Sequence, residues 1–231
     1  MNSKKGGKVN KLLVLCSVFL LVFGFAGSAS AVIISYDYSY SSDDTLTTPY
    51  SWASVETFDS SLLLWSWAGS GEVVSGSVVN KYAAPYNNSV MSAPDTTKYV
   101  TVPDPDGGNS GSYTAALEGI YDYFGLFWGS VDTYNTLSFL YLGNPVASYT
   151  GTDITTPNAA NGNQAAPSTN LYVNFLDLPD FDSFMMSSSN FAFEADNIAV
   201  GVNPVPEPAT MLLLGAGLIG LVGIGRKKFK T

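Results

Sequence analysis

The chain contains no histidine and only one cysteine, and these absences exclude several classes of functional site. Without histidine there can be no Ser-His-Asp triad, no imidazole base and no His-ligated zinc. Cys16 lies in an apolar segment close to the N-terminus, so the rest of the chain has no thiol nucleophile, disulfide or Cys-based metal site. Hydrolysis by paired carboxylates stays open, but sequence spacing does not fix the gap between two carboxyl groups.

Positive charge is scarce except at the two ends of the chain. Between Val32 and Val205 only Lys81 and Lys98 stand against eighteen carboxylates, which leaves a formal charge of −16. Nucleic acids and anionic membrane surfaces attract basic proteins, so neither is expected as a partner. Divalent cations, neutral glycans or plain solubility remain as reasons for the acidity, and we favour solubility.

The N-terminal segment has the pattern of a secretory signal peptide. Four lysines precede an apolar run from Leu12 to Phe25, and Ala29 and Ala31 supply small residues at a cleavage site. This pattern predicts a signal peptide over residues 1–31, cut after Ala31. A lipoprotein cysteine needs a small residue before it, whereas Leu15 precedes Cys16. We therefore interpret Cys16 as an ordinary residue of the apolar run, without a function of its own.

The C-terminal segment has the pattern of a short membrane span. Ala209 to Gly225 is apolar and uncharged, and as a helix it would measure about 25 Å, close to the thickness of a bilayer's hydrocarbon core. A buried core helix fits less well, because five glycines disfavour a soluble helix. The short glycine-rich run suits temporary residence in a membrane. A basic tail over residues 226–230 would hold that end in the cytoplasm. Its charges are Arg226, Lys227, Lys228 and Lys230.

Just before the apolar run stands the tetrapeptide Val205, Pro206, Glu207, Pro208. Motif, apolar segment and basic end together resemble the PEP-CTERM sorting signal of bacterial exosortase substrates, over residues 204–231. The resemblance implies that an exosortase, working with the secretion machinery in the inner membrane, cleaves near the motif. It also implies that the exported domain is then released or transferred to the cell surface or the extracellular matrix.

Residues 32–203 are predicted to form one exported β domain. Short runs of β-branched and aromatic residues recur between Gly, Pro, Asn and Asp, and no window keeps a helical period. Many short strands with almost no helix favour a single jelly-roll-like or lectin-like β-sandwich. The predicted strands are Val32–Tyr38, Ser54–Phe58, Ser61–Trp67, Glu72–Val79, Lys98–Val102, Ser112–Leu117, Ile120–Trp128, Thr136–Tyr141, Val146–Thr150, Leu171–Phe175, Phe181–Met186 and Phe191–Val200. Loops are expected at Pro103–Gly111 and Thr155–Thr169.

Two segments of this domain carry a second resemblance. The segment from Tyr123 to Phe139 contains a WGS-x-D-x-YN-x-L pattern, and Phe191–Val200 contains the sequence DNI. Both are similar to segments of a family of exosortase-dependent bacterial surface proteins. The resemblance implies a lectin-like β domain on the cell surface or in exopolysaccharide, and it supplies no established catalytic residues.

The same segment holds the residues that we consider first for a ligand site. Trp128 could offer an aromatic face to a sugar ring, while Asp132 and Asn135 could bond its hydroxyls. The alternative is a structural corner, in which Asp132 and Asn135 bond the backbone of the turn at Gly129 and Ser130. The structural corner is the favoured interpretation, and core packing is the favoured role for any one tryptophan.

The acidic loop PDPDGGNSG invites a calcium interpretation, because hard cations prefer carboxylate and amide oxygens. Asp104, Asp106 and Asn109 would be the ligands, but the spacing is not that of an EF-hand, and a surface turn is favoured. Asp196 and Asn197, beside the last strand, could also meet a cation, with an Asx turn equally plausible. No other cofactor is predicted.

The sequence therefore predicts an exported, non-enzymatic protein with a structural or adhesive role associated with exopolysaccharide. A carbohydrate-binding, lectin-like module is the alternative. A carboxylate-dependent glycan hydrolase is a third, less favoured hypothesis. With only two lysines in the exported domain, a nucleic-acid partner is not expected.

Overall fold

The fold is seen in a computed structural model, which describes residues 31–37, 48–86, 94–154 and 160–204. The chain separates into two units, residues 1–31 and 32–231. Every described residue except Ala31 belongs to the second unit. No helix within the described ranges combines the length and the apolar character that crossing a membrane requires.

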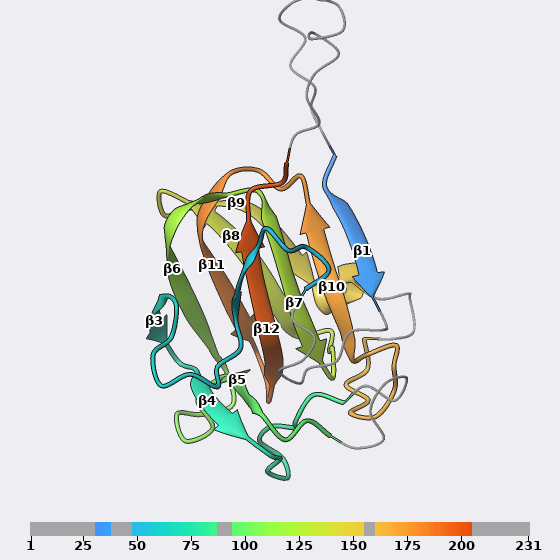
Figure 1. The fold of residues 1–231 in the computed structure, drawn as a ribbon. Helices are drawn as coiled ribbons and strands as arrows, with labels where there is room; N and C mark the ends of the chain where they lie inside the picture. Colours follow the sequence, from blue (N-terminus) through green and yellow to red (C-terminus); the bar gives the residue numbers. More distant parts are fainter. Residues whose placement is uncertain (1–30, 38–47, 87–93, 155–159, 205–231) are drawn as a thin grey trace, which may run out of the picture. The chain divides into compact units, whose positions relative to one another are not determined.

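The described part of the chain is all-β, with strands arranged in two antiparallel sheets (Figure 1). One sheet has seven strands, in the order β1 (Ile33–Asp37), β10 (Leu171–Leu176), β7 (Tyr123–Gly129), β12 (Phe193–Gly201), β5 (Lys98–Val102) and β4 (Glu72–Ser75), with β2 (Ser54–Glu56) also paired to β12. The other has five, in the order β3 (Ser66–Gly69), β6 (Gly111–Tyr121), β11 (Phe181–Ser188), β8 (Asn135–Tyr141) and β9 (Asn144–Thr150). One helical turn, α2 (Gly151–Ile154), follows β9.

The alternation of side chains along β10 shows how the sequence builds the layers. Leu171, Val173 and Phe175 belong to the buried core cluster. Tyr172 and Asn174 point to the opposite face, as expected from the period of two along a strand. There the Tyr172 hydroxyl donates to the Asn197 carbonyl at 3.0 Å, and Asn174 accepts from the Tyr123 hydroxyl at 2.8 Å. The predicted orientation of this strand is confirmed.

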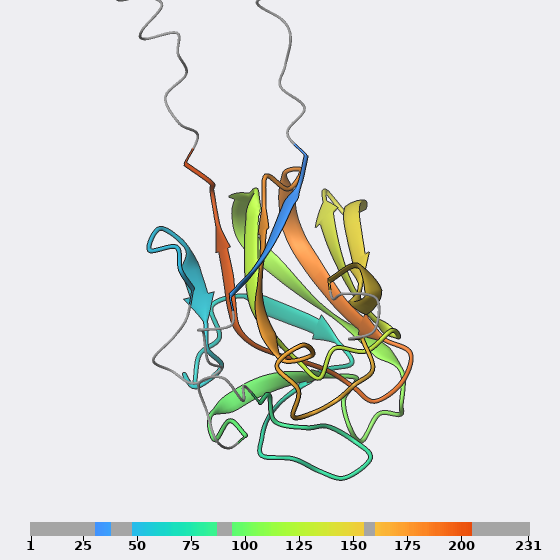
Figure 2. The same ribbon diagram turned by 90° about the vertical axis from the view of Figure 1, so that its right-hand side faces the viewer.

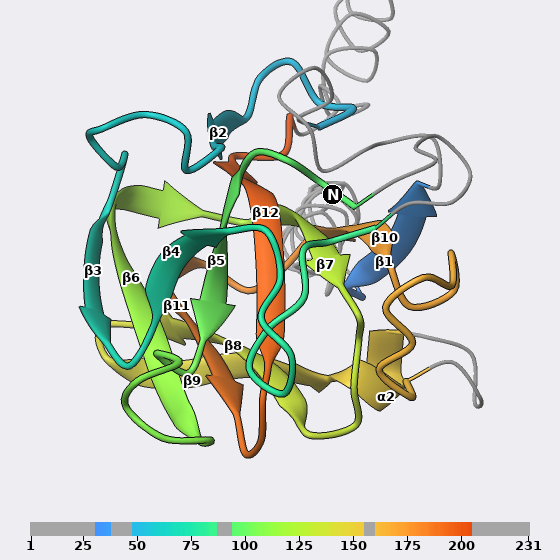
Figure 3. The same ribbon diagram turned by 90° about the horizontal axis from the view of Figure 1, so that it is seen from below.

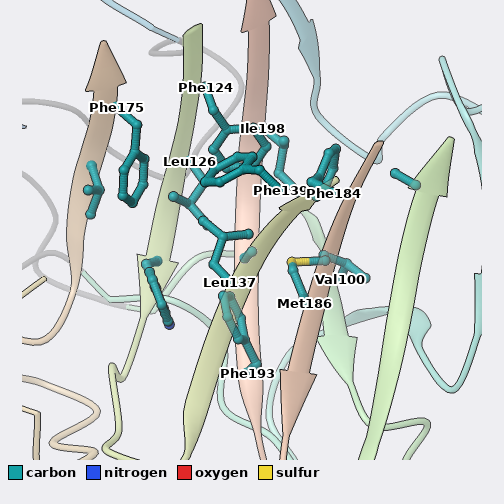
Figure 4. Packing of buried hydrophobic residues seen from close by; sticks show 14 of the residues in the cluster. Val100, Phe124, Leu126, Leu137, Phe139, Phe175, Phe184, Met186, Phe193 and Ile198 are labelled. Atoms are coloured by element: carbon teal, nitrogen blue, oxygen red, sulfur yellow. The ribbon is translucent and has the colours of Figure 1, made fainter. Parts of the chain in front are cut away.

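Aromatic side chains from both sheets meet in the core. The ring of Phe124, on β7, lies 5.0 Å from the ring of Phe139 on β8 and 4.7 Å from that of Phe184 on β11, centroid to centroid (Figure 4). These edge-on contacts are each worth roughly 0.5–1.5 kcal/mol beyond the buried area. Figure 2 shows the layer containing β8 and β9 (yellow) on one side and β12 (red) on the other. The two sheets are therefore packed face to face.

Strand β12 exchanges partners halfway along its length. Its first part, Phe193–Ala195, pairs with β5, and its last part, Ile198–Val200, pairs with β2. On its other side the register against β7 shifts between Asp196 and Ala199. Asn197, within this irregular stretch, has a φ of 49°, in the left-handed region. The middle of β12 is consequently irregular toward both neighbours.

Most predicted strands form, but several boundaries differ. The prediction that a strand begins at Ser61 is wrong: β3 begins at Ser66, because the preceding residues turn and the Leu64 amide donates to Glu56 at 2.6 Å. The break predicted between Leu117 and Ile120 falls at Asp122 instead. The predicted segments 1–30 and 205–231, including the membrane span and basic tail, lie outside the described residues.

Candidate functional site

A polar pocket of about 330 Å³ opens where the end of β7 meets the start of β12. Figure 1 shows these two strand ends at the lower side of the sheet. Segments from distant parts of the chain form its walls, namely the loop before β5, the turn after β7, the loop around residue 162 and the β11–β12 connection. Its lining residues are Val78, Asn80, Lys81, Tyr82, Ser130, Asp132, Tyr134, Gly162, Gln164, Asn190, Phe191, Ala192 and Glu194. The volume lies at the lower end of the range for small-molecule sites.

Glu194 lines this pocket, and its carboxyl group is hydrogen-bonded to two separate segments of the chain. The side chain is 2% exposed; one carboxyl oxygen accepts from the Ala83 amide at 2.9 Å, and the other from the Ser130 hydroxyl at 2.6 Å. Burial raises the pKa of Glu194 to about 8, against the lowering effect of these two hydrogen bonds. At neutral pH the group therefore tends to carry its proton, and it presents little negative charge to the pocket.

Asp132 and Tyr134 form a second polar group on the turn after β7. Burial raises the pKa of Asp132, and the neighbouring Tyr134 side chain partly offsets this rise. The Tyr134 hydroxyl donates its one proton to the Phe191 carbonyl at 2.7 Å, and burial raises the pKa of this phenol. The turn is thereby joined to the β11–β12 connection. Gly162 closes the opposite side with a φ of 66°, and a Cβ there would collide with the Asp132 carboxylate.

Lys81 is the one positively charged residue among those that line the pocket. Its ammonium lies 2.7 Å from the Asp106 carboxylate, and the two side chains are 38% and 88% exposed. This hydrogen bond raises the pKa of Lys81 and lowers the pKa of Asp106. Solvent screens an exposed pair of this kind, so it contributes little to stability. The charge is thus already paired at the rim and leaves the interior of the pocket uncharged on that side.

The structure separates the residues that the sequence grouped as a ligand site. Asp132 lines the pocket. Trp128 is fully buried, with its ring stacked on Phe193 at a centroid distance of 4.2 Å, so neither face is open to a sugar. Asn135 is also fully buried; its side-chain oxygen accepts from the Ser188 hydroxyl at 2.9 Å, and its backbone amide donates to the Asp132 carbonyl. Trp128 and Asn135 are therefore buried parts of the fold, and neither lines the pocket.

The acidic loop predicted as a weak calcium site is a turn with internal partners. Asp104 accepts the Asp106 amide at 2.9 Å, and Asp106 pairs with Lys81, while Asn109 is exposed. Within the described ranges, no three acidic, histidine or cysteine side chains are grouped closely enough to hold a metal ion by themselves. Of the predicted processing residues, only Ala31 falls within the described ranges; Ala29, the VPEP motif and the basic tail do not.

Sequence reasoning did not select Glu194, Ser130 or the loop from Val78 to Tyr82 as parts of a site. That loop is closed by two backbone hydrogen bonds between Val78 and Tyr82, at 2.9 and 3.1 Å. One signal was available: Glu194 stands between apolar residues in the first half of the predicted strand Phe191–Val200, whose other polar residues are Asp196 and Asn197. A glutamate on a strand that is buried on both faces needs a partner, because charged residues are almost never fully buried unless they are paired.

Comparisons with known proteins concern mainly the C-terminal end. The family model described as the PEP-CTERM protein-sorting motif matches residues 204–227. No curated protein matches the chain. Among solved structures, the enzymatically active domain of tailspike protein 4 from bacteriophage CBA120 is similar at 19% identity and a TM-score of 0.30. The match covers 59% of this chain and 19% of that one, so it spans about a fifth of the tailspike structure.

Proposed function

We propose that this chain, a PEP-CTERM protein, is exported and processed by an exosortase, and that its β domain then has an adhesive role in the extracellular matrix. The sorting motif at residues 204–227 supports the route. The signal peptide, the membrane span over residues 209–225 and a final location at the cell surface or in exopolysaccharide are part of the same proposal. We also propose that the two sheets belong to a jelly-roll or lectin-like architecture.

One observation supports recognition of a carbohydrate as the means of adhesion: a polar pocket among loops at one end of the two sheets. Its exposed lining offers amide groups from Asn80, Gln164 and Asn190, beside the half-buried rings of Tyr82 and Tyr134. Amides and hydroxyls bond sugar hydroxyls without requiring charge, and tyrosine rings cover the apolar face of a sugar. The lectin-like role is therefore the finer form of the adhesive proposal.

A binding role accounts better for the pocket's carboxyl groups than catalysis does. Both oxygens of Glu194 already hold parts of the fold, one through Ala83 and the other through Ser130. A general acid must give its proton to a substrate atom within hydrogen-bonding reach. Releasing Glu194 for that purpose would leave the Ala83 amide, a buried donor, without its acceptor. We accordingly propose a non-catalytic site.

The route is tested by expressing the full-length chain in bacterial strains with and without an exosortase system. The expected result is a shortened C-terminus and a change of location that occur only in the strain with the system. Mass spectrometry of the purified protein and fractionation of the cells provide the measurements. An identical C-terminus and identical location in both strains would contradict the proposal.

The binding role is tested with the full-length protein, purified in mild detergent, on a glycan array. Gln164→Ala and Asn190→Ala remove exposed groups that line the pocket and should each weaken binding by about tenfold, the effect of losing one hydrogen bond of roughly 1.4 kcal/mol. Asn109→Ala removes an exposed amide away from the pocket lining and serves as the matched control. If no glycan binds, the purely structural role is left; if Asn109→Ala weakens binding equally, the pocket is not the site.

A further inference from the structure

Three aspartates converge where β12 exchanges partners. Asp59 lies shortly after β2, Asp95 shortly before β5, and Asp196 in the irregular middle of β12 itself. Figure 3 shows β2 and β5 following one another along the same side of β12. The Lys98 amide, at the start of β5, donates to Asp59 at 3.0 Å, which joins the two ends at this junction. The gap left in the backbone ladder is thus filled by acidic side chains.

Each of these aspartates has one satisfied oxygen and one oxygen without a donor. Asp95 Oδ1 accepts the amide and hydroxyl of Thr97 at 2.8 and 2.6 Å, and Asp196 Oδ1 accepts the Asn197 amide at 2.7 Å. The Oδ2 atoms of Asp59, Asp95 and Asp196 are buried and have no hydrogen-bond partner. Asp95 and Asp196 are 2% and 1% exposed. A buried charged oxygen without a partner is costly, so a proton, a water molecule or a cation is expected at these atoms.

The carboxyl groups of Asp95 and Asp196 are also in contact with each other. They lie within hydrogen-bonding range, and the charge of Asp59 acts on Asp196 as well. Two carboxylate oxygens are both acceptors, so they can meet only when a proton or a cation lies between them. No lysine or arginine supplies that cation, since the ion pair found within the described ranges joins Lys81 to Asp106.

We propose that a calcium ion binds between Asp95 and Asp196 at the β2–β5–β12 junction. Calcium takes six to eight oxygen ligands and accepts backbone carbonyls and water beside carboxylates. Within the described residues no three acidic side chains are grouped closely enough to hold an ion, so backbone carbonyls and water would complete the coordination beside the two carboxylates. Asp59 then acts on the ion through its charge. The ion connects the segment before β5 to the centre of the seven-stranded sheet, and it stabilises a domain whose acidity otherwise opposes folding.

Thermal unfolding of the full-length chain in mild detergent tests the proposal at pH 7.5. The four tryptophans lie between residues 52 and 128, so their fluorescence reports on the β domain alone. At calcium concentrations about 100-fold above the dissociation constant, the unfolding midpoint should rise by about 5–10 °C relative to the chain in EGTA. Calorimetric titration should give one ion per chain. No rise in midpoint and no binding heat would overturn the proposal.

Two variants distinguish calcium from a shared proton and from the acidic loop. Asp196→Asn replaces a carboxylate by an amide that can donate to Asp95, so it mimics a pair that shares a proton and should still fold. We expect it to lose both the calcium-dependent rise and the binding heat, whereas Asp104→Asn should keep both. If the wild type ignores calcium and Asp196→Asn is equally stable, the pair shares a proton. If Asp104→Asn abolishes the response, the ion binds at the loop. Either result refutes the assignment.

Discussion

Replacing Glu194 by glutamine should remove much of the pH dependence of the domain's unfolding free energy between about pH 5 and pH 8. Burial raises the pKa of Glu194 from 4.5 to about 8, so over that interval the folded state holds a proton that the unfolded state has released. Stability therefore falls as the pH rises, and the loss is complete above about pH 8. At 1.36 kcal/mol per pKa unit, the upper limit of this loss is roughly 5 kcal/mol.

Glutamine is well suited to this position because it resembles the protonated acid. Its side-chain oxygen can still accept from the Ala83 amide, and its NH₂ group can donate to the Ser130 hydroxyl. At pH 5 the variant and the wild type should differ by less than about 1 kcal/mol. At pH 8 the variant should be the more stable protein, by a few kcal/mol.

The measurement is urea unfolding of the full-length chain in mild detergent at pH 5, 6.5 and 8, followed by tryptophan fluorescence. Subtracting the two unfolding free energies at each pH removes the contribution of every other titrating group. Glu118→Gln, at an exposed glutamate of β6, is the matched control and should follow the wild type throughout. A difference between wild type and Glu194→Gln that stays constant from pH 5 to pH 8 would refute this reasoning.

Three further substitutions test the site and its support. Gly162→Ala should abolish glycan binding on the array, because the new Cβ collides with Asp132 and the φ of 66° disfavours alanine; retained binding would place the ligand elsewhere. Asn170→Ala should destabilise the domain by about 3 kcal/mol in urea, since the buried amide accepts from the Ser130 and Tyr86 backbone amides at 3.0 and 3.1 Å; a loss below about 0.5 kcal/mol would contradict this. Phe124→Ala should cost about 3–5 kcal/mol through the cavity left between the sheets, measured in the same way.

Local pattern was sufficient to predict most of the strands. Leu171, Val173 and Phe175 alternate with polar residues, and that period alone identified their buried face. The prediction was wrong at Ser61 because Leu62 and Leu64 give the segment the composition of a strand, although they are 80% and 51% exposed. Composition does not reveal whether a partner strand lies alongside, and pairing is what defines a strand in a sheet.

The candidate site was only partly predictable, for a topological reason. Asp132 could be predicted as a ligand-site residue because the local sequence indicates the turn in which it lies. The pocket also needs Lys81 and Glu194, which are 51 and 62 residues away from Asp132 in the chain. Trp128 looked suitable for a sugar because of its chemistry, but its ring is stacked on Phe193 in the core. Single-sequence patterns do not report such long-range neighbours.

The central position of β12 has a mechanical consequence. The strand starts beside the pocket at Glu194 and ends at Gly201, three residues before the matched sorting motif. A tensile force between a bound polysaccharide and a C-terminal attachment would therefore run along β12. Because β12 is hydrogen-bonded to β7 on one side and to β5 and β2 on the other, that force would shear several rows of bonds together instead of opening them one at a time. The edge strand β1 is bonded on one side only and would separate more easily under the same load.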